Sequence, residues 1–166
     1  GSPHRWIVPL SEAADCPEDL VGGKAAKLAR LMRAGFTVPG GFCITTAAYE
    51  HFVTANGLTA CIAMELGRKS LEGMRWEELW DAALRIRGEF LRAEVPRAIS
   101  AEIRQALAEH AGDDAVAVRS SAPGEDSGRM SFAGLHESVV GPKGVSAVLD
   151  AVQTVWSSLW SDAALL

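Results

Sequence analysis

Three things are scarce in this 166-residue sequence: cysteine, long apolar runs and basic charge. The three cysteines, Cys16, Cys43 and Cys61, lack metal-ligand spacing, so we expect buried or incidental thiols in a reducing compartment rather than a disulfide framework. No apolar run approaches the roughly 20 residues that span a bilayer, and no charged-then-apolar leader opens the chain. With 16 basic and 21 acidic residues, the net charge of -5 offers no broad field for nucleic acid or an anionic membrane. These absences predict a cytoplasmic protein without a nucleic-acid or membrane partner.

The composition is that of a folded globular protein. Hydrophobic residues make up 48% and charged residues 22%, which excludes a disordered chain, and the length suits one domain or part of a larger one. We interpret Gly1-Ser2 as the remnant of an expression tag. The closing "SDAALL" has the pattern of a further helix, so we expect a piece of a longer protein.

Strands and helices alternate along the chain with helices in excess, which favours an α/β or α+β fold. Apolar spacing and turn residues locate the elements. The expected strands cover 7–10, 42–45, 115–118 and 135–140. The expected helices cover 24–34 with Leu28, Leu31 and Met32 on its apolar face, a short segment with Tyr49, Phe52 and Val53 on one face, two middle helices, and 145–159.

The helical middle carries two amphipathic stripes and no chemistry that we can identify. The stripes consist of Leu79, Ala83, Ile86 and Phe90, and of Ile99, Ile103, Ala106 and His110. On an apolar stripe, His110 is expected to be a half-buried packing residue. Trp76 and Trp80 are expected in the core or in an interface rather than as a platform for stacked bases.

The first cluster whose residues are suited to binding or catalysis is "VGGKAAKL". Two glycines allow close backbone approach, a helix N-terminus offers free N–H donors, and Lys24 adds a positive charge, so the segment is suited to an anion. Ala25 stands where a P-loop has the Ser or Thr that binds magnesium. Two interpretations stay open: an anion pocket, or a glycine turn before a helix with a solvated lysine.

The second cluster is "AVRSSAPGEDSGRMSFAGLHESV". Arg119 is expected at the end of a strand, where its guanidinium can bind phosphate oxygens while the hydroxyls of Ser120 and Ser121 complete the hydrogen bonds. The glycines and small residues that follow suit a loop that opens and closes over a ligand. The alternative is that Arg119 pairs with Glu125 or Asp126 and that the segment is an ordinary hairpin.

Together the two clusters resemble the nucleotide-binding domain of the pyruvate phosphate dikinase, phosphoenolpyruvate synthase and rifampicin phosphotransferase family. The segments that carry the resemblance are "VGGKAAKLARLMRAGFTVPGGFCITTAAYEHF" and "VAVRSSAPGEDSGRMSFAGLHES". It implies the N-terminal portion of an ATP-grasp-like fold, helix-rich with a small mixed or antiparallel sheet. The family holds ATP phosphates with the lysine of "GGK" and the arginine of "RSS", which are Lys24 and Arg119 here.

The resemblance extends the expected nucleotide site. The segment "SFAG" looks like the family's glycine-rich loop over the phosphates, and Ser138 stands near a hydroxyl position of the family. Lys24 and Arg119 are the implied catalytic residues, because they would neutralise charge on the transferring phosphates. The residues expected to contact ATP are Lys24, Arg119, Ser120, Ser131, Phe132, Ala133, Gly134 and Ser138, with no metal ligand among them.

The resemblance also implies an enzyme of which this chain is one part. Residues 3–166 would form the N-terminal subdomain of an ATP-binding domain, and a second ATP-grasp subdomain with the Mg²⁺ ligands would follow Leu166. The expected enzyme is a dikinase-type phosphotransferase that passes phosphate from ATP through an enzyme histidine to pyruvate or another small acceptor, and the isolated piece should not turn over. The alternative is a non-catalytic binding or regulatory module of the same fold, which would contact a partner protein through the apolar surface that the second subdomain would otherwise cover. Formation of a homodimer that buries the Trp156–Trp160 face would favour this alternative.

Overall fold

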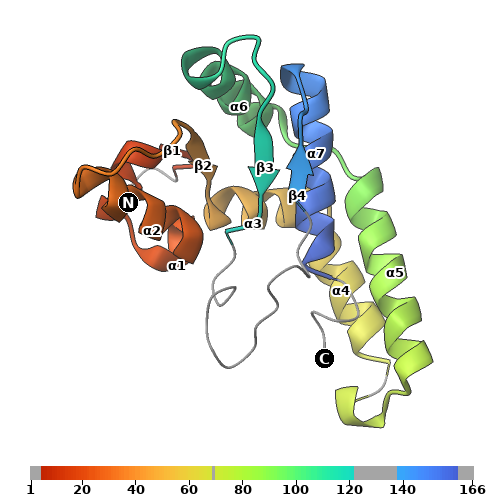
Figure 1. The fold of residues 1–166 in the computed structure, drawn as a ribbon. Helices are drawn as coiled ribbons and strands as arrows, with labels where there is room; N and C mark the ends of the chain where they lie inside the picture. The colour runs from red at the N-terminus through yellow and green to blue at the C-terminus, as the bar shows by residue number, and fades with distance from the viewer. Residues whose placement is uncertain (1–4, 69, 122–137, 161–166) are drawn as a thin grey trace.

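The computed structural model describes residues 5–68, 70–121 and 138–160 (Figure 1). It has a helix-rich α+β fold with two small antiparallel sheets, which confirms the predicted fold class. Figure 1 shows an N-terminal unit at one side, the β3–β4 sheet over α7 in the middle, and the paired α4 and α5 at the other side. Within the described residues, no helix combines the length and the apolar character needed to cross a membrane.

The N-terminal unit is a two-stranded sheet with short helices packed beside it. Its elements are β1 (Ile7–Pro9), the 3-10 helix η1 (Leu10–Asp15), α1 (Glu18–Val21), α2 (Gly23–Arg33) and β2 (Phe42–Ile44). The strands pair antiparallel, with Val8 opposite Cys43. The sequence did not predict η1 and α1, because six and four residues are too few to show helical periodicity.

Helix α2 fully buries small side chains, and two of the three predicted apolar residues, Leu28 and Met32, are partly buried beside them. Ala25, Ala26 and Ala29 are its buried residues, and they face the small core of the N-terminal unit. Leu31, which the pattern placed on the apolar face, is 43% exposed. The prediction was wrong for Leu31 only, since Leu28 and Met32 are partly buried against this core, beside the three alanines that allow the helix to pack closely. Gly35, with a φ of 92°, follows the end of the helix as predicted.

The helical body contains the larger core. Its elements are α3 (Thr46–Ala55), α4 (Leu58–Leu66), η2 (Leu71–Gly73), α5 (Trp76–Arg92), α6 (Arg97–His110) and α7 (Gly144–Ser158). Burial confirms most of the two middle stripes: Leu79, Ala83, Ile86, Phe90, Ile99, Ile103 and Ala106 are all buried. These stripes pack α5 and α6 against α3 and α7, and so support the β3–β4 sheet.

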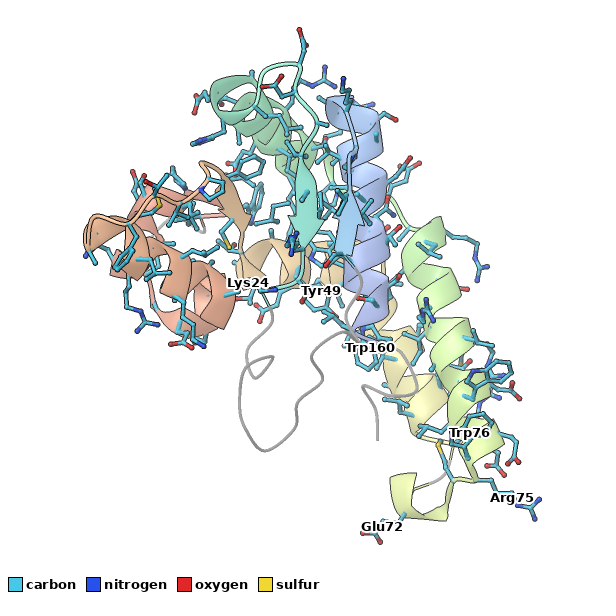
Figure 2. The ribbon with its side chains drawn as sticks, viewed as in Figure 1. Lys24, Tyr49, Glu72, Arg75, Trp76 and Trp160 are labelled. Atoms are coloured by element: carbon cyan, nitrogen blue, oxygen red, sulfur yellow. The ribbon has the colours of Figure 1, made fainter. Side chains whose placement is uncertain are left out.

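Aromatic rings from three helices meet at the centre of this core. The ring of Phe52 on α3 lies 5.8 Å from that of Phe90 on α5 and 4.8 Å from that of Trp156 on α7, between centroids. Beside them the indole N–H of Trp160 donates to the hydroxyl of Tyr49 at 3.1 Å, and burial raises the pKa of Tyr49 (Figure 2). Trp156 is 8% exposed and lies in this core, whereas Trp160 is only partly buried, so self-association through the Trp156–Trp160 face stays a prediction.

Three other aromatic residues are exposed. His110 is exposed rather than half-buried, although its ring contacts that of Phe42 at 5.7 Å between centroids. It is the last residue of α6, where the helix leaves its neighbours. Trp76 and Trp80 are 56% and 43% exposed, so this chain does not bury them in its core.

The cysteines are free thiols, as expected from their number and spacing. Cys43 lies in the core of the N-terminal unit, and burial raises its pKa to about 12. A thiol held in its protonated form is a poor nucleophile, so Cys43 has a packing role.

Candidate functional site

The β3–β4 sheet places two of the predicted site residues opposite each other. β3 (Ala117–Arg119) pairs antiparallel with β4 (Ser138–Val140), and Arg119 lies across from Ser138. Val118 packs towards the core, whereas Arg119 and Ser138 are exposed. Because neighbouring residues of a strand point to opposite faces, Arg119 and Ser138 share the open face of this sheet.

Just after β3, the chain contacts the N-terminus of α2. The hydroxyl of Ser121 accepts a hydrogen bond from the backbone N–H of Ala25 at 3.0 Å and donates one to the carbonyl oxygen of Val21 at 2.9 Å. The Ala25 amide is one of the first-turn donors that a helix leaves without an internal partner. Ser121 therefore caps α2 from a position 96 residues further along the chain, and it joins the two sequence clusters directly.

Gly22 allows this contact because it has no side chain. It is the N-cap residue of α2, with φ 84° and ψ 161°, a conformation that is essentially restricted to glycine. A Cβ at this position would lie 1.5 Å from the carbonyl oxygen of Ser121. The first glycine of "GGK" therefore makes room for the backbone of the "RSS" segment.

The same junction holds both predicted cations. Lys24 is half-buried in the first turn of α2, and Figure 2 shows it on the side that faces α3 and the end of β3. Arg119 is exposed at the end of β3, two residues before Ser121, and Ser120 between them is buried. Two cations beside a helix N-terminus form a surface that favours an anion.

Part of the predicted site lies outside the residues that the structure describes. These are the four residues of "SFAG", Ser131, Phe132, Ala133 and Gly134. Glu125 and Asp126, the alternative ion-pair partners considered for Arg119, also lie there. Their predicted roles stay predictions. The structure thus brings together Lys24, Arg119 and Ser120 at one junction, with Ser138 opposite Arg119.

The side chains at the junction suit phosphate oxygens and do not suit a metal ion. The Lys24 ammonium and the Arg119 guanidinium donate hydrogen bonds and cannot ligate a cation. Across residues 5–68, 70–121 and 138–160, no group of three or more His, Cys, Asp or Glu side chains is arranged to hold a metal. The chemistry available here is charge neutralisation and hydrogen-bond donation.

The family model of the pyruvate phosphate dikinase AMP/ATP-binding domain matches residues 18–166, which include both halves of this junction. The chain belongs to this family. It is 40% identical over 98% of its length to the phosphoenolpyruvate synthase of Aeropyrum pernix and 30% identical over 96% to the rifampicin phosphotransferase of Bacillus subtilis. It spans about a fifth of the length of these curated relatives. The family members are phosphotransferase enzymes.

Sequence reasoning located the two cations but missed how they are brought together. It grouped Ser121 with Ser120 as a phosphate contact, whereas the Ser121 hydroxyl is used on α2. The sequence contained part of the signal for this contact. The N-cap residue Gly22 has no side chain, so a hydroxyl that caps the helix has to come from elsewhere in the chain.

We expect Ser121→Ala to lower the free energy of unfolding by about 1.5 kcal/mol, because it removes a helix cap and one further hydrogen bond. Urea denaturation followed by circular dichroism measures this change. Ser146→Ala, at an exposed position of α7, is the matched control and should change stability by less than about 0.5 kcal/mol. Equal effects of the two substitutions would show that the cap contributes nothing.

Proposed function

We propose that this chain supplies the phosphate-binding part of an ATP site in a dikinase-type phosphotransferase. The observation that carries the proposal is the Ser121 contact, which holds the "RSS" segment on the N-terminus of α2 next to Lys24. The match to an AMP/ATP-binding domain family supports a nucleotide as the source of the anion.

In this proposal each residue of the junction has a distinct task. The Lys24 ammonium and the Arg119 guanidinium bind the transferring phosphates and offset the charge that builds up on them during transfer. Arginine can bind two phosphate oxygens at once, whereas lysine acts as a single charge. Ser120 and Ser138 add hydroxyl donors from beside and opposite Arg119, and residues 131–134 close over the phosphates. Ser121 positions these groups and does not itself touch the nucleotide.

Magnesium and the phosphate acceptor enter from outside this junction. Mg²⁺ would arrive with the ATP phosphates. Its protein ligands would come from other parts of the enzyme, since the charged side chains of the junction, Lys24 and Arg119, are positive and cannot ligate a cation. The phosphate would pass through an enzyme histidine to pyruvate or to another small acceptor. The names of the curated relatives, phosphoenolpyruvate synthase and rifampicin phosphotransferase, support a small-molecule acceptor. Because the chain spans only about a fifth of those relatives, it would bind ATP and not complete the transfer.

Binding of Mg-ATP to the chain tests the proposal. Equilibrium dialysis should detect weak binding by the wild type, and Lys24→Ala and Arg119→Ala should each weaken it by about tenfold or more, since each removes a charge-assisted contact to phosphate. The wild type should also unfold at a higher temperature in excess Mg-ATP, a shift that both variants reduce.

Lys27→Ala is the matched control, because it removes the same charge from an exposed position three residues further along α2. Its dissociation constant should stay within about twofold of the wild type. If all three alanine variants bind equally, or if the wild type does not bind at millimolar Mg-ATP, this junction is not a phosphate site.

A further inference from the structure

A second apolar face of α5 lies outside the core. Trp76, Trp80, Leu84 and Leu91 are all exposed, and they follow one another along the helix at spacings that keep them on one side. We call these four residues the α5 stripe. The adjoining face of the same helix carries the buried residues of the core. Isolated exposed apolar residues are ordinary on a protein surface, but an aligned set headed by two tryptophans marks an interaction surface.

The α5 stripe is separate from the proposed phosphate site. Figure 1 shows α5 along the edge of the molecule away from α1 and α2, and Figure 2 shows Trp76 far from Lys24. The indole rings of Trp76 and Trp80 stack on each other, with centroids 6.2 Å apart and 11° between their planes. This stacking holds the two exposed rings together at the N-terminal end of the helix.

Charge is distributed unevenly along α5. Its first half carries three acidic residues, Glu77, Glu78 and Asp81. Its second half carries three basic residues, Arg85, Arg87 and Arg92, and one acidic residue, Glu89. Part of the second half is already paired, since Arg85 contacts Glu65 and Arg92 contacts Glu89. By contrast, Glu77, Asp81 and Arg87 form no ion pair with any other described residue, and the Nε of Arg87 is buried without a hydrogen-bond partner. The helix is therefore acidic at one end and basic at the other, with charges still available on both.

We propose that the α5 stripe binds the α5 stripe of a second copy of this chain, with the two helices antiparallel. This orientation sets the acidic end of each helix against the basic end of the other, and the arrangement closes as a twofold dimer. With the axis near Leu84, Asp81 of each copy meets Arg87 of the other. A parallel pairing would instead set like charges together, and a partner of uniform charge would complement only one end.

Gly88 supports this register. A glycine inside a helix costs about 0.5–1 kcal/mol relative to alanine, so its presence in the middle of α5 calls for a reason. In the antiparallel dimer, Trp80 of one copy lies over Gly88 of the other, where the missing side chain leaves room for the indole. Within one copy a Cβ at Gly88 would make only ordinary contact, at 3.4 Å from the Arg92 side chain, so the fold of the single chain does not demand glycine there.

Sedimentation equilibrium of the chain from micromolar to about millimolar concentration tests the dimer. We expect a reversible monomer–dimer equilibrium, which Trp80→Ala weakens by about tenfold or more, because a central aromatic residue is lost from both sides of the interface. Phe36→Ala is the matched control: Phe36 is exposed but lies away from α5, and its replacement should leave the equilibrium unchanged.

A charge exchange tests the register. Asp81→Arg and Arg87→Asp should each weaken self-association by about tenfold or more, because each sets like charges against each other across the interface. When the two variants are mixed, the heterodimer restores both pairs and should form as well as the wild-type dimer. Glu102→Lys on α6 controls for a change in net charge alone. Circular dichroism and the thermal midpoint verify that each variant is folded. If Arg87→Asp does not fold, Trp80→Ala and Asp81→Arg, both at exposed positions, still test the interface.

Three results would overturn the proposal. The wild type could remain monomeric throughout the concentration range, which would leave the stripe to a different partner. A dimer could persist undiminished in folded Trp80→Ala and Asp81→Arg, which would place its interface elsewhere. Finally, the mixture of charge variants could associate no better than either variant alone, which would exclude the antiparallel register.

Discussion

Gly22→Ala is expected to destabilise the chain by about 3 kcal/mol or more, from two independent causes. The backbone at Gly22 has φ 84° and ψ 161°, which an L side chain can adopt only with strain. The new Cβ would also fall 1.5 Å from the carbonyl oxygen of Ser121, far inside contact distance, so one of the two segments must move. Because both segments are backbone, the clash cannot be relieved by turning a side chain.

Denaturation by urea, compared with Gly23→Ala, measures this effect. Gly23 is the next residue and begins α2, and a Cβ there would meet only the end of the flexible Glu18 side chain at 3.3 Å. We expect Gly23→Ala to change the free energy of unfolding by less than about 1 kcal/mol. If the proposed phosphate site is correct, Gly22→Ala should also weaken Mg-ATP binding, since it drives Ser121 away from α2. A fully stable Gly22→Ala protein would contradict the close approach of the two segments.

Phe52→Ala is expected to destabilise the chain by about 3–5 kcal/mol, the largest effect that we predict for the core. Phe52 is fully buried between Phe90 and Trp156, and it connects α3 to α5 and α7. Truncation removes its apolar contacts and leaves a cavity that three helices, held by their other contacts, can fill only in part. Because a loss of this size is a large part of the stability of a small domain, partial unfolding at room temperature is an expected outcome.

The matched control for Phe52→Ala removes the same atoms from the surface. Phe36 is 64% exposed in the connection between α2 and β2, so Phe36→Ala should cost less than about 1 kcal/mol. The difference between the two midpoints in urea, together with a loss of near-ultraviolet circular dichroism in Phe52→Ala, measures the packing of the aromatic cluster. Similar midpoints for the two variants would show that α3, α5 and α7 do not pack tightly around Phe52.

The amphipathic helices could be predicted from the sequence, as could the positions of Lys24 at the start of α2 and of Arg119 at the end of β3, because both are local signals. The stripes of α5 and α6 follow the period of the helix, and burial of seven of their eight residues confirms them. Lys24 follows two glycines at the start of α2, as its position in "GGK" indicated. Periodicity was less informative in α2, where three alanines are the most buried residues and Leu31 is exposed, because hydrophobicity patterns report apolar character and not how closely a helix packs.

Other features depend on contacts that no local pattern contains. The predicted apolar stripe of α6 included one residue too many, the exposed His110. Whether a residue at the end of a helix is exposed depends on where the neighbouring elements end. The second apolar face of α5 was visible only as two tryptophans, and a sequence pattern cannot tell a core residue from one on an open surface. Trp156, in contrast, was considered for an interface and lies in the core beside Phe52.

The sequence by itself determined which side chains the candidate site offers: its cations, its hydroxyls and the glycines beside them, since these depend on residue type. Only the tertiary structure decided that the two clusters form one junction and which side chain joins them. The hydrogen bond from the Ala25 amide to Ser121 spans 96 residues, and Gly22 permits it by lacking a Cβ. The physical reason is that a free amide at a helix N-terminus requires a partner but does not specify where along the chain it comes from.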